Sequence, residues 1–526
     1  MVRDLCLDRL KLRFEKNPNE PIYFSYNNNF WQPISVKNFI NHCKQFSKSL
    51  ISCNVTNNAK VAILGFNTLE WVVSCVATQY IGAISVGIYP TSSKEEVLYI
   101  LQHSDAEVLV VQNLSMYLSQ VKPIINNAKN IKYIVIMQGE IANEAVIKWS
   151  DFLNLGKLIS DNELDNYFTD IKPSDAATII YTSGTTANPK AVMLSHSSIA
   201  FSARTVSKLY NCQSSDRSIS YLPLAHVAEQ MFTIYAPMEC GLKSYMLASF
   251  EMLNKAIAQV RPTIFFGVPR VYEKMYDGFI NNFQNQGILF VWFLKLFTYF
   301  ISKEFINKCN KKNNNIFINF FAKLARKTIL LKIKEKSGFL QTRLLLSGAA
   351  PLSKNIINFF CSLDMPIYEI YGQSEGGGPS TLNYPGNIKI GSVGKPLKET
   401  HLKIANDGEI LLKGPQVFMG YYKDQQATSE TLNDGWLYSG DIGYIDSDGY
   451  LHITDRKKDI IITAGGKNIA PISIENKLKH IPFIQSAVVV GDKQKFLSAL
   501  FAPDIKSLKN KEKEYGFSLE IGRAHV

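Results

Sequence analysis

The 526-residue sequence lacks the cysteine patterns that organise small secreted domains and structural metal sites. Its eight cysteines are scattered along the chain, and no two of them stand in CxxC spacing. Disulfide frameworks and zinc sites both depend on regularly spaced cysteines, so neither is expected here. Scattered thiols instead fit a protein of a reducing compartment.

The sequence also lacks a hydrophobic run long enough to cross a membrane, and its start, MVRDLCLDRL, shows no signal-peptide pattern. The most hydrophobic window, 287–301 (GILFVWFLKLFTYFI), contains Lys295 and is shorter than the roughly 20 residues of a spanning helix. A helix packed against the protein is the default interpretation. A helix lying on a membrane surface is the alternative, which the basic run at 303–336 favours. We expect a cytoplasmic protein and leave open its peripheral contact with the cytosolic face of membranes.

Acidic residues are outnumbered by basic ones: 45 Asp and Glu stand against 57 Lys and Arg, so the net charge is +12. The lysines are spread, without an arginine-rich stripe or an aromatic–basic module, so nucleic-acid binding is not expected. Attraction to anionic substrates or to a membrane surface is the more economical interpretation. The apolar content of 46% and the length are those of a globular protein with several layers or domains.

Segments typical of strands alternate with segments typical of helices before the middle of the chain. We expect a short strand and a helix within 31–48, helices at 69–81 and 95–102, and strands at 60–66, 84–88, 108–111 and 132–137. This alternation predicts a parallel α/β architecture. Open parallel sheets bind their ligands beyond the carboxyl ends of the strands.

Residues 181–196, YTSGTTANPKAVMLSH, are the most informative stretch of the sequence. The preceding run AATIIY predicts a buried strand, and Ser195 or Ser197 can cap a helix that continues to Tyr210. The hydroxyl-rich loop between them offers backbone N–H groups and a lysine to a polyanion, which suggests a phosphate cradle. A plain turn would explain the TSGTT run alone. A Walker-type loop would need Gly-Lys-Ser/Thr, whereas Pro189 precedes Lys190 here.

The whole sixteen-residue string resembles the phosphate-binding signature of the adenylate-forming superfamily, which contains acyl-CoA synthetases, luciferases and peptide-synthetase adenylation domains. The resemblance covers about Trp31 to Pro503 through at least five motifs in order. The strings GIYPTSS, LPLAHVAEQ, VRPTIFFGVPRVYEKM and SGAAPLS are most similar to eukaryotic long-chain acyl-CoA synthetases of the bubblegum type. Two positions depart from the family, because Ala187 and Ala191 stand where the family usually has glycine. If either position requires a positive φ, alanine there would destabilise the loop by about 1 kcal/mol or more.

The resemblance implies roles for individual residues. ATP or AMP would be bound by Thr182, Ser183, Gly184, Thr185, Thr186, Lys190, Gly348, Ala349, Ala350, Tyr371, Gly372, Ser374, Asp441 and Arg456. Catalysis would depend on Lys190, on Glu375, which would also hold Mg²⁺, and on Lys458 at the hinge between domains. The acyl pocket would contain His226, Gly267 and Val268, although an isolated histidine is more often structural. Gly465, Gly466 and Lys467 would belong to the loop that closes for the CoA half-reaction.

The implied fold is α/β, with a large domain of mixed and parallel sheets flanked by helices (1–454) and a small α+β domain (455–519). The implied reaction joins a long-chain fatty acid to CoA: the carboxylate attacks ATP to give acyl-adenylate and pyrophosphate, and the CoA thiol then displaces AMP. An aromatic-acid (4-coumarate-like) ligase and a catalytically inactive acyl- or nucleotide-binding homologue are the alternatives. An amino-acid adenylating domain is disfavoured because no acidic residue lies within 221–226.

The resemblance fades after Pro503, and no glycine- and lysine-bearing segment follows that would reach the acyl carboxylate during adenylation. The last six residues, IGRAHV, are what the bases ATC GGA AGA GCA CAC GTC encode, a run that resembles a sequencing adapter. We expect residues 520–526 to be a non-native tail and the small domain to be truncated. The chain as written is then expected to bind ATP and to adenylate fatty acid poorly.

Overall fold

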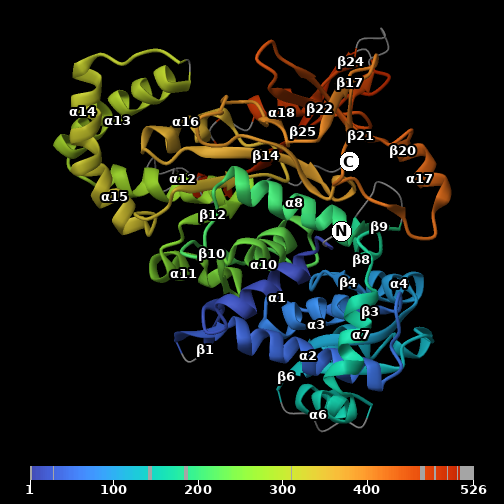
Figure 1. The fold of residues 1–526 in the computed structure, drawn as a ribbon. Coiled ribbons are helices and arrows are strands. Elements are labelled where there is room, and N and C mark those ends of the chain that lie inside the picture. Colours follow the sequence, from blue (N-terminus) through green and yellow to red (C-terminus); the bar gives the residue numbers. More distant parts are fainter. Residues whose placement is uncertain are drawn as a thin grey trace. The chain divides into compact units, whose positions relative to one another are not determined.

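The computed structural model describes residues 3–27, 29–139, 145–182, 188–309, 311–462, 468–478, 481, 483–494, 496–505 and 508–509 (Figure 1). The chain forms two compact units. Unit 1 contains Met1–His401 and Leu412–Leu437, and unit 2 contains Leu402–Leu411 and Tyr438–Val526. Our boundary at residue 454 stays a prediction.

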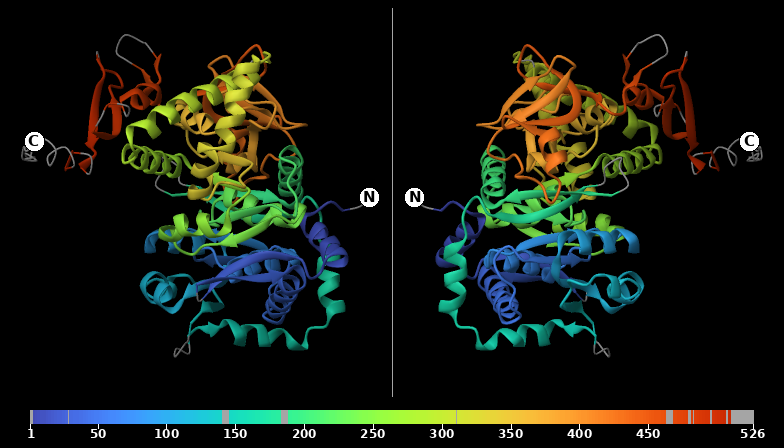
Figure 2. Two further views of the ribbon diagram at one scale, coloured as in Figure 1. Left: turned by 90° about the vertical axis from the view of Figure 1, so that its left-hand side faces the viewer. Right: turned by 90° about the vertical axis from the view of Figure 1, so that its right-hand side faces the viewer.

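An eight-stranded sheet organises the first part of unit 1. Its order is β19-β9-β8-β4-β3-β5-β6-β7, and the pairs from β8 to β7 are parallel. The bounds are β3 Lys60–Leu64, β4 Ile84–Ile88, β5 Ala106–Asn113, β6 Tyr133–Gln138, β7 Ile147–Lys148, β8 Ala176–Thr182, β9 Lys190–Ser195 and β19 Gly420–Tyr421. The parallel α/β architecture predicted from the alternating pattern is thus confirmed. In both views of Figure 2 the blue-to-cyan first part of the chain gathers around this sheet.

Side-chain caps explain where the helices beside this sheet begin. Helix α2 (Val36–Ser52) begins after Ser35, whose hydroxyl accepts a hydrogen bond from the Asn38 amide at 3.2 Å. Helix α3 (Leu69–Tyr80) follows Thr68 in the same way, and α4 (Lys94–Ser104) begins with a capping box formed by Ser93 and Glu96. Such caps satisfy backbone N–H groups that have no partner inside the helix. The strands therefore alternate with helices that have well-defined starts.

The structure corrects one expectation at the central loop. A strand, β9, lies between the loop and helix α8 (His196–Leu209), where we expected the chain to pass directly from loop to helix. β9 pairs antiparallel with β8, so the loop connects two hydrogen-bonded strands. The sequence KAVMLS supports a strand because Ala191, Val192 and Leu194 are apolar and buried within the sheet. The expected cap is confirmed, since the Ser195 hydroxyl accepts from the Ser198 amide at 3.1 Å.

Two further sheets complete unit 1. The first has the order β10-β11-β1-β2, and the second β12-β13-β14-β15-β16. Their bounds are β1 Pro21–Asn27, β2 Phe30–Ser35, β10 Arg217–Ser220, β11 Lys243–Met246, β12 Ile264–Gly267, β13 Leu344–Ser347, β14 Ile367–Gln373, β15 Gly378–Leu382 and β16 Lys395–Pro396. The predicted strand-to-loop transitions before residues 348 and 374 coincide with the ends of β13 and β14.

Helix α1 (Cys6–Lys16) docks on a helix far along the chain. Leu7 and Leu10 are buried, and Arg13 donates hydrogen bonds of 3.0 Å to the carbonyl oxygens of Met238 and Glu239 in α10 (Ala236–Cys240). These carbonyls lie in the last turn of α10, where a cation is favoured by the helix dipole. The contact fixes α1 to the body of unit 1.

The most hydrophobic window forms helix α13 (Ile288–Cys309), followed by α14 (Ile316–Lys327) and α15 (Ile329–Ser337). Leu294 and Ile301 are buried in a core that also includes residues of α14 and α15. The packed-helix interpretation is therefore confirmed for one side of α13. Within the described parts of the chain, no helix has the length and apolar content needed to cross a membrane.

Unit 2 is smaller and contains strands with little helix. The strands that lie wholly or partly in it include β17 (His401–Ile404), β18 (Glu409–Lys413), β21 (Trp436–Ile445), β22 (Leu451–Arg456), β25 (Ile484–Val490) and β26 (Ser498–Pro503), and its helix α18 spans Pro471–Leu478. The β21–β22 turn is closed by Asp446, whose carboxylate accepts from the amides of Asp448 and Tyr450 at 3.0 Å. Asp446 and Asp448 thus form a turn, as their DSDG sequence predicts.

Candidate active site

The ends of the predicted phosphate loop are held together by strand pairing. Thr182 ends β8 and Lys190 begins β9, and the two residues stand opposite each other in the ladder. Ser183, Gly184, Thr185 and Thr186 lie outside the described residues. Ala191 is buried in β9 and is not among the residues with positive φ, so alanine costs no backbone strain there. Ala187 lies outside the described residues.

Lys190 and Glu375 meet at a tyrosine that sequence reasoning missed. The Lys190 Nζ lies 4.7 Å from the ring centroid of Tyr421, and the Tyr421 hydroxyl donates a hydrogen bond of 2.8 Å to Glu375 Oε1. Tyr421 is placed by β19, which pairs with β9, and by its amide, which donates to Thr428 Oγ1 at 2.9 Å. Unit 1 thus brings together two of the predicted catalytic residues, a cation and a carboxylate, across one aromatic ring.

The environment of Tyr421 keeps its phenol protonated. Burial and the neighbouring Glu375 carboxylate both raise the pKa of Tyr421. The phenol therefore remains a hydrogen-bond donor at physiological pH, and it fixes one oxygen of Glu375. The run Gly420, Tyr421, Tyr422 could have been recognised in the sequence as a short strand, but its distant partner could not.

A single carboxylate at this place fits a magnesium ion that is bound mainly by phosphate. Glu375 lies in the short helix η6 (Ser374–Gly376) directly after β14 and is partly exposed. In the described part of the chain no three His, Cys, Asp or Glu side chains gather into a metal-binding group. Mg²⁺ commonly takes one or two carboxylates together with water and substrate phosphates. The predicted role of Glu375 is compatible with that donor set.

The loop after β13 approaches the neighbouring strand closely. A Cβ on Gly348 would stand 3.0 Å from the carbonyl oxygen of Ile370, and Ala349 has φ +69°. A non-glycine residue in the left-handed region costs roughly 1–2 kcal/mol. Strain of this kind concentrates at ligand-binding positions. The nucleotide-binding role of Gly348, Ala349 and Ala350 stays a prediction.

Strand β14 carries the other predicted nucleotide residues of unit 1. Tyr371 and Ser374 are buried, and Gly372 lies so close to β15 that a Cβ there would stand 2.0 Å from the Gly378 carbonyl oxygen. Only glycine is compatible with this approach. The strand therefore delivers Ser374 and Glu375 to its tip with little freedom.

In unit 2, Asp441 and Arg456 stand opposite each other on β21 and β22. Arg456 Nε lies 3.2 Å from Asp441 Oδ1, and Asp441 is only 6% exposed. The neighbouring Lys457 is anchored by two carboxylates, Asp407 and Glu409, each 2.7 Å from its Nζ. Lys458 is exposed in the turn that follows. The pairing of Asp441 with Arg456 suits the two predicted ribose contacts, and the hinge role of Lys458 stays a prediction. Gly465, Gly466 and Lys467 lie outside the described residues.

The three residues predicted for the acyl pocket occupy the ends of structural elements. His226 caps the short helix α9 (Val227–Gln230), and its Nδ1 accepts from the Ala228 amide at 3.1 Å. Burial lowers the pKa of His226, so the ring is neutral at pH 7. Gly267 ends β12, and Val268 precedes α12 (Pro269–Gln284). The structure gives His226 a capping role, and its contact with substrate stays a prediction.

Close to His226, a buried carboxylate fixes the same segment. Glu229 accepts a hydrogen bond of 2.6 Å from Thr233, and Asn67 donates to Ser220 Oγ at 2.7 Å and to the Leu222 carbonyl at 2.8 Å. Burial raises the pKa of Glu229 to about 7. Glu229 is 3% exposed and hydrogen-bonded within the chain, so it is not available to a substrate amine. Its role is to hold the segment around His226 in place.

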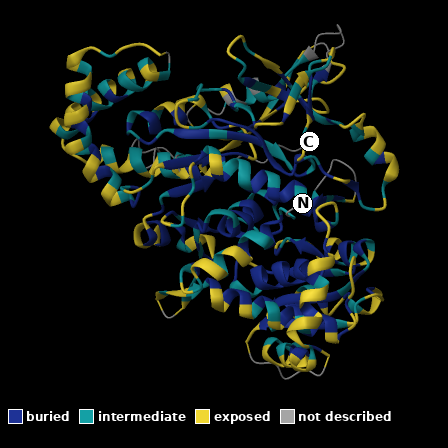
Figure 3. Cartoon of the chain, viewed as in Figure 1, coloured by how far each residue is buried: buried dark blue, intermediate teal, exposed yellow. Residues whose placement is uncertain are grey.

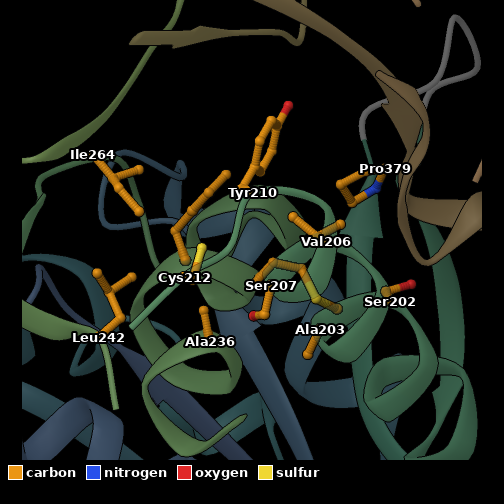
Figure 4. A pocket seen from close by; sticks show the side chains of 12 residues that line it. Ser202, Ala203, Val206, Ser207, Tyr210, Cys212, Ala236, Leu242, Ile264 and Pro379 are labelled. Carbon is orange, nitrogen blue, oxygen red and sulfur yellow. The ribbon is translucent and has the colours of Figure 1, made fainter. Parts of the chain in front are cut away.

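A small apolar cavity lies beside α8 (Figure 4). Its volume is about 20 Å³, and its lining includes Val206, Tyr210, Cys212 and Ile264. Pockets for small molecules usually span about 300–1,000 Å³, and a cavity of this size holds about one water. His226, Gly267 and Val268 are not among its lining residues. In this conformation the cavity has no room for a fatty acyl chain.

Comparison with protein families finds two matching models. The model described as AMP-binding enzyme matches residues 10–422, and the model of the AMP-binding enzyme C-terminal domain matches residues 458–519. Long-chain-fatty-acid–CoA ligase ACSBG2 of Xenopus laevis is 36% identical over 487 residues, covering 89% of this chain and 65% of the relative. The human protein of the same name is also 36% identical, covering 91% of this chain and 73% of the relative. The chain thus spans about two thirds to three quarters of these relatives.

Solved structures show the same fold at low sequence identity. The anthranilate CoA ligase AuaEII in complex with anthranoyl-AMP superimposes with a TM-score of 0.75 at 19% identity, covering 99% of this chain and 92% of that one. ATP-bound MatB from Rhodopseudomonas palustris gives a TM-score of 0.73 at 21% identity, covering 97% and 92%. The α/β fold with a smaller C-terminal domain and the resemblance to bubblegum-type long-chain ligases are confirmed.

Proposed function

Because the chain belongs to the AMP-binding enzyme family, we propose that it is an ATP-dependent long-chain fatty acid–CoA ligase. It would activate the carboxylate as acyl-adenylate with release of pyrophosphate, and CoA would then displace AMP. The observation that carries this proposal is the convergence of Lys190, Tyr421 and Glu375 at one place in unit 1. The names of the relatives at 36% identity support a fatty acid as the acid.

The first step needs charge neutralisation and alignment more than it needs a nucleophilic side chain. ATP already carries the leaving group, so no Ser–His–Asp triad is required. We propose that Lys190 supplies positive charge to the phosphates and that Tyr421 holds Glu375 in its orientation. Glu375 would hold Mg²⁺, which neutralises phosphate charge when it is bound. Asp441 and Arg456 would bind the ribose.

Substrate choice is tested by comparing a fatty acid with an aromatic acid. We expect ATP-dependent pyrophosphate release to be faster with palmitate than with coumarate, and acyl-CoA to form only when CoA is present. Faster turnover of coumarate would establish the aromatic-acid alternative. If neither acid releases pyrophosphate while ATP still binds, the chain as written is inactive, which is expected both of an inactive homologue and of a small domain without the lysine-bearing segment.

The role of Tyr421 can be tested without removing its ring. Tyr421→Phe keeps the aromatic face beside Lys190 and deletes only the hydroxyl that holds Glu375. We expect the Mg²⁺ concentration for half-maximal pyrophosphate release to rise about 10–100-fold, the usual cost of losing a partner that orients a metal ligand.

The matched control is Tyr422→Phe, the same change one residue later. The Tyr422 hydroxyl donates to Asp105 at 3.0 Å instead of to Glu375. An unchanged Mg²⁺ dependence in Tyr421→Phe, or an equal shift in both variants, would contradict a positioning role for Tyr421.

A further inference from the structure

Helix α13 presents apolar side chains on the side that faces away from the core. Ile288, Trp292 and Tyr299 are 88%, 58% and 60% exposed. At 100° per residue they share a stripe with Lys295, Lys303 and Ile306, opposite the inward stripe that contains Leu294 and Ile301. Figure 3 shows exposed positions along these helices. The helix is therefore apolar on both sides, and only one side is covered.

Helix α14 repeats this arrangement. Ile316, Phe317 and Phe320 are 82%, 69% and 60% exposed, whereas Ala322 and Ala325 are fully buried. The two helices pack through Phe321, whose ring stacks on Phe300 with centroids 4.7 Å apart. We define the outer face as the exposed apolar residues Ile288, Leu289, Trp292, Phe293, Tyr299, Ile306, Ile316, Phe317, Phe320 and Leu324.

The same segment carries most of the net positive charge of the chain. Residues 287–337 contain eleven Lys or Arg residues and two Glu residues, a net charge of +9 against +12 for the whole sequence. Arg326 is engaged by Glu304 and Asp364, and Lys334 by Asp364. Lys295, Lys303, Lys323 and Lys327, by contrast, are exposed on α13 and α14. Cations thus lie among and beside the apolar residues.

We propose that the outer face of α13 and α14 binds the surface of an anionic lipid bilayer. Exposed apolar side chains would enter the headgroup region, where Trp and Tyr are favoured. The lysines would extend to the lipid phosphates while their stems cover apolar surface. Each lysine near an anionic surface adds about fivefold to the partition coefficient. The two contributions together suit peripheral binding.

The charge argues against a second copy of the chain as the occupant. A two-fold interface places the same patch against itself, so the exposed Lys295, Lys303, Lys323 and Lys327 would meet the same cations of the second copy. Like charges brought together across an interface disfavour association. An anionic bilayer instead supplies the opposite charge over an extended area.

The test is co-sedimentation of the full chain with vesicles. We expect binding to vesicles of phosphatidylcholine with phosphatidylserine, weaker binding to phosphatidylcholine alone, and release on raising salt. Ile288→Ser combined with Trp292→Ser should abolish binding. The matched control combines Phe30→Ser with Leu158→Ser, because these residues are 73% and 96% exposed elsewhere in unit 1. That control should bind like the unchanged chain.

The contribution of the lysines to vesicle binding is tested with a separate pair of variants. Lys295→Gln with Lys303→Gln should weaken binding to anionic vesicles roughly 25-fold, whereas Lys122→Gln with Lys129→Gln should leave it unchanged. These surface substitutions spare the buried side of α13, and an unchanged thermal unfolding midpoint verifies that each variant is folded. Absence of binding to anionic vesicles at low salt would overturn the proposal. So would self-association without lipid that the Ile288 and Trp292 changes abolish.

Discussion

Replacing Glu375 with glutamine is expected to lower acyl-adenylate formation by about three orders of magnitude. The substitution removes the negative charge and keeps the shape of the side chain. Its amide oxygen can still accept from Tyr421, so the local structure should survive. What is lost is the anionic ligand for Mg²⁺. The measurement is Mg²⁺-dependent pyrophosphate release with ATP and palmitate.

The matched control is Glu369→Gln, six residues earlier in the chain and within β14. Burial raises the pKa of Glu369 to about 7, so this carboxyl is already partly protonated at neutral pH and glutamine should resemble it. We expect the control to retain activity. Mg²⁺-dependent pyrophosphate release that is unchanged in Glu375→Gln would remove this residue from the metal site.

Replacing Asp216 with alanine is expected to destabilise unit 1 by about 3 kcal/mol. Asp216 is 4% exposed, and its carboxylate accepts from Arg343 Nε at 2.9 Å and Nη2 at 2.6 Å and from Thr263 at 2.7 Å. It precedes β10, and its partners precede β12 and β13, so it links two sheets. Its loss would leave a partly buried guanidinium without a carboxylate. The midpoint of urea unfolding measures the effect.

An exposed ion pair provides the comparison for this variant. Glu273 pairs with Arg270 at 3.2 Å, with both side chains at least 40% exposed, so Glu273→Ala should change stability by less than about 0.5 kcal/mol. If Asp216→Ala unfolded at the same urea concentration as this control, the link that Asp216 forms between the two sheets would not contribute to the stability of unit 1.

The contribution of Asp216 should also depend on pH. Burial alone would raise its pKa, but hydrogen bonds from Arg343, Thr263 and the Gln213 amide outweigh burial and hold the pKa below its ordinary value of 3.8. A carboxyl with a lowered folded-state pKa stabilises the fold above its unfolded-state pKa, and this stabilisation is lost as pH falls through the folded-state pKa. The stability difference between the unchanged chain and Asp216→Ala should therefore shrink in acid. A difference that stays constant down to the acid transition would contradict this assignment.

Local sequence patterns predicted most of the large sheet because its strands are apolar runs that are buried on both faces. The strand at 84–88 was predicted with its observed bounds, and the helices beside it differ from the structure only at their ends. β9 was missed although KAVMLS is compatible with a strand, because the short apolar run lies between the loop and the helix cap, and only its pairing with β8 distinguishes a strand from a continued loop. The covered and the exposed side of α13 could not be distinguished in the sequence, because both are apolar. Only tertiary packing decides which of them is buried.

The candidate site was predictable where one motif holds several residues and unpredictable where distant segments meet. Thr182 and Lys190 belong to one string, and Ser374 and Glu375 to another. Tyr421 lies more than 200 residues beyond Lys190, and its hydroxyl is directed at Glu375 by the pairing of β19 with β9. A hydrogen bond of this kind leaves no signal in a single sequence.

The docking of α1 on α10 has a consequence for the order of folding during synthesis. Arg13 cannot reach the carbonyls of Met238 and Glu239 until the ribosome has added more than 220 further residues. At about 5–20 residues per second this takes roughly 10–45 s, whereas a helix forms in microseconds. Throughout that interval the apolar side of α1, with Leu7 and Leu10, can pack on α2 but lacks the surface that α10 supplies. The nascent chain should therefore be a client of chaperones until α10 has emerged.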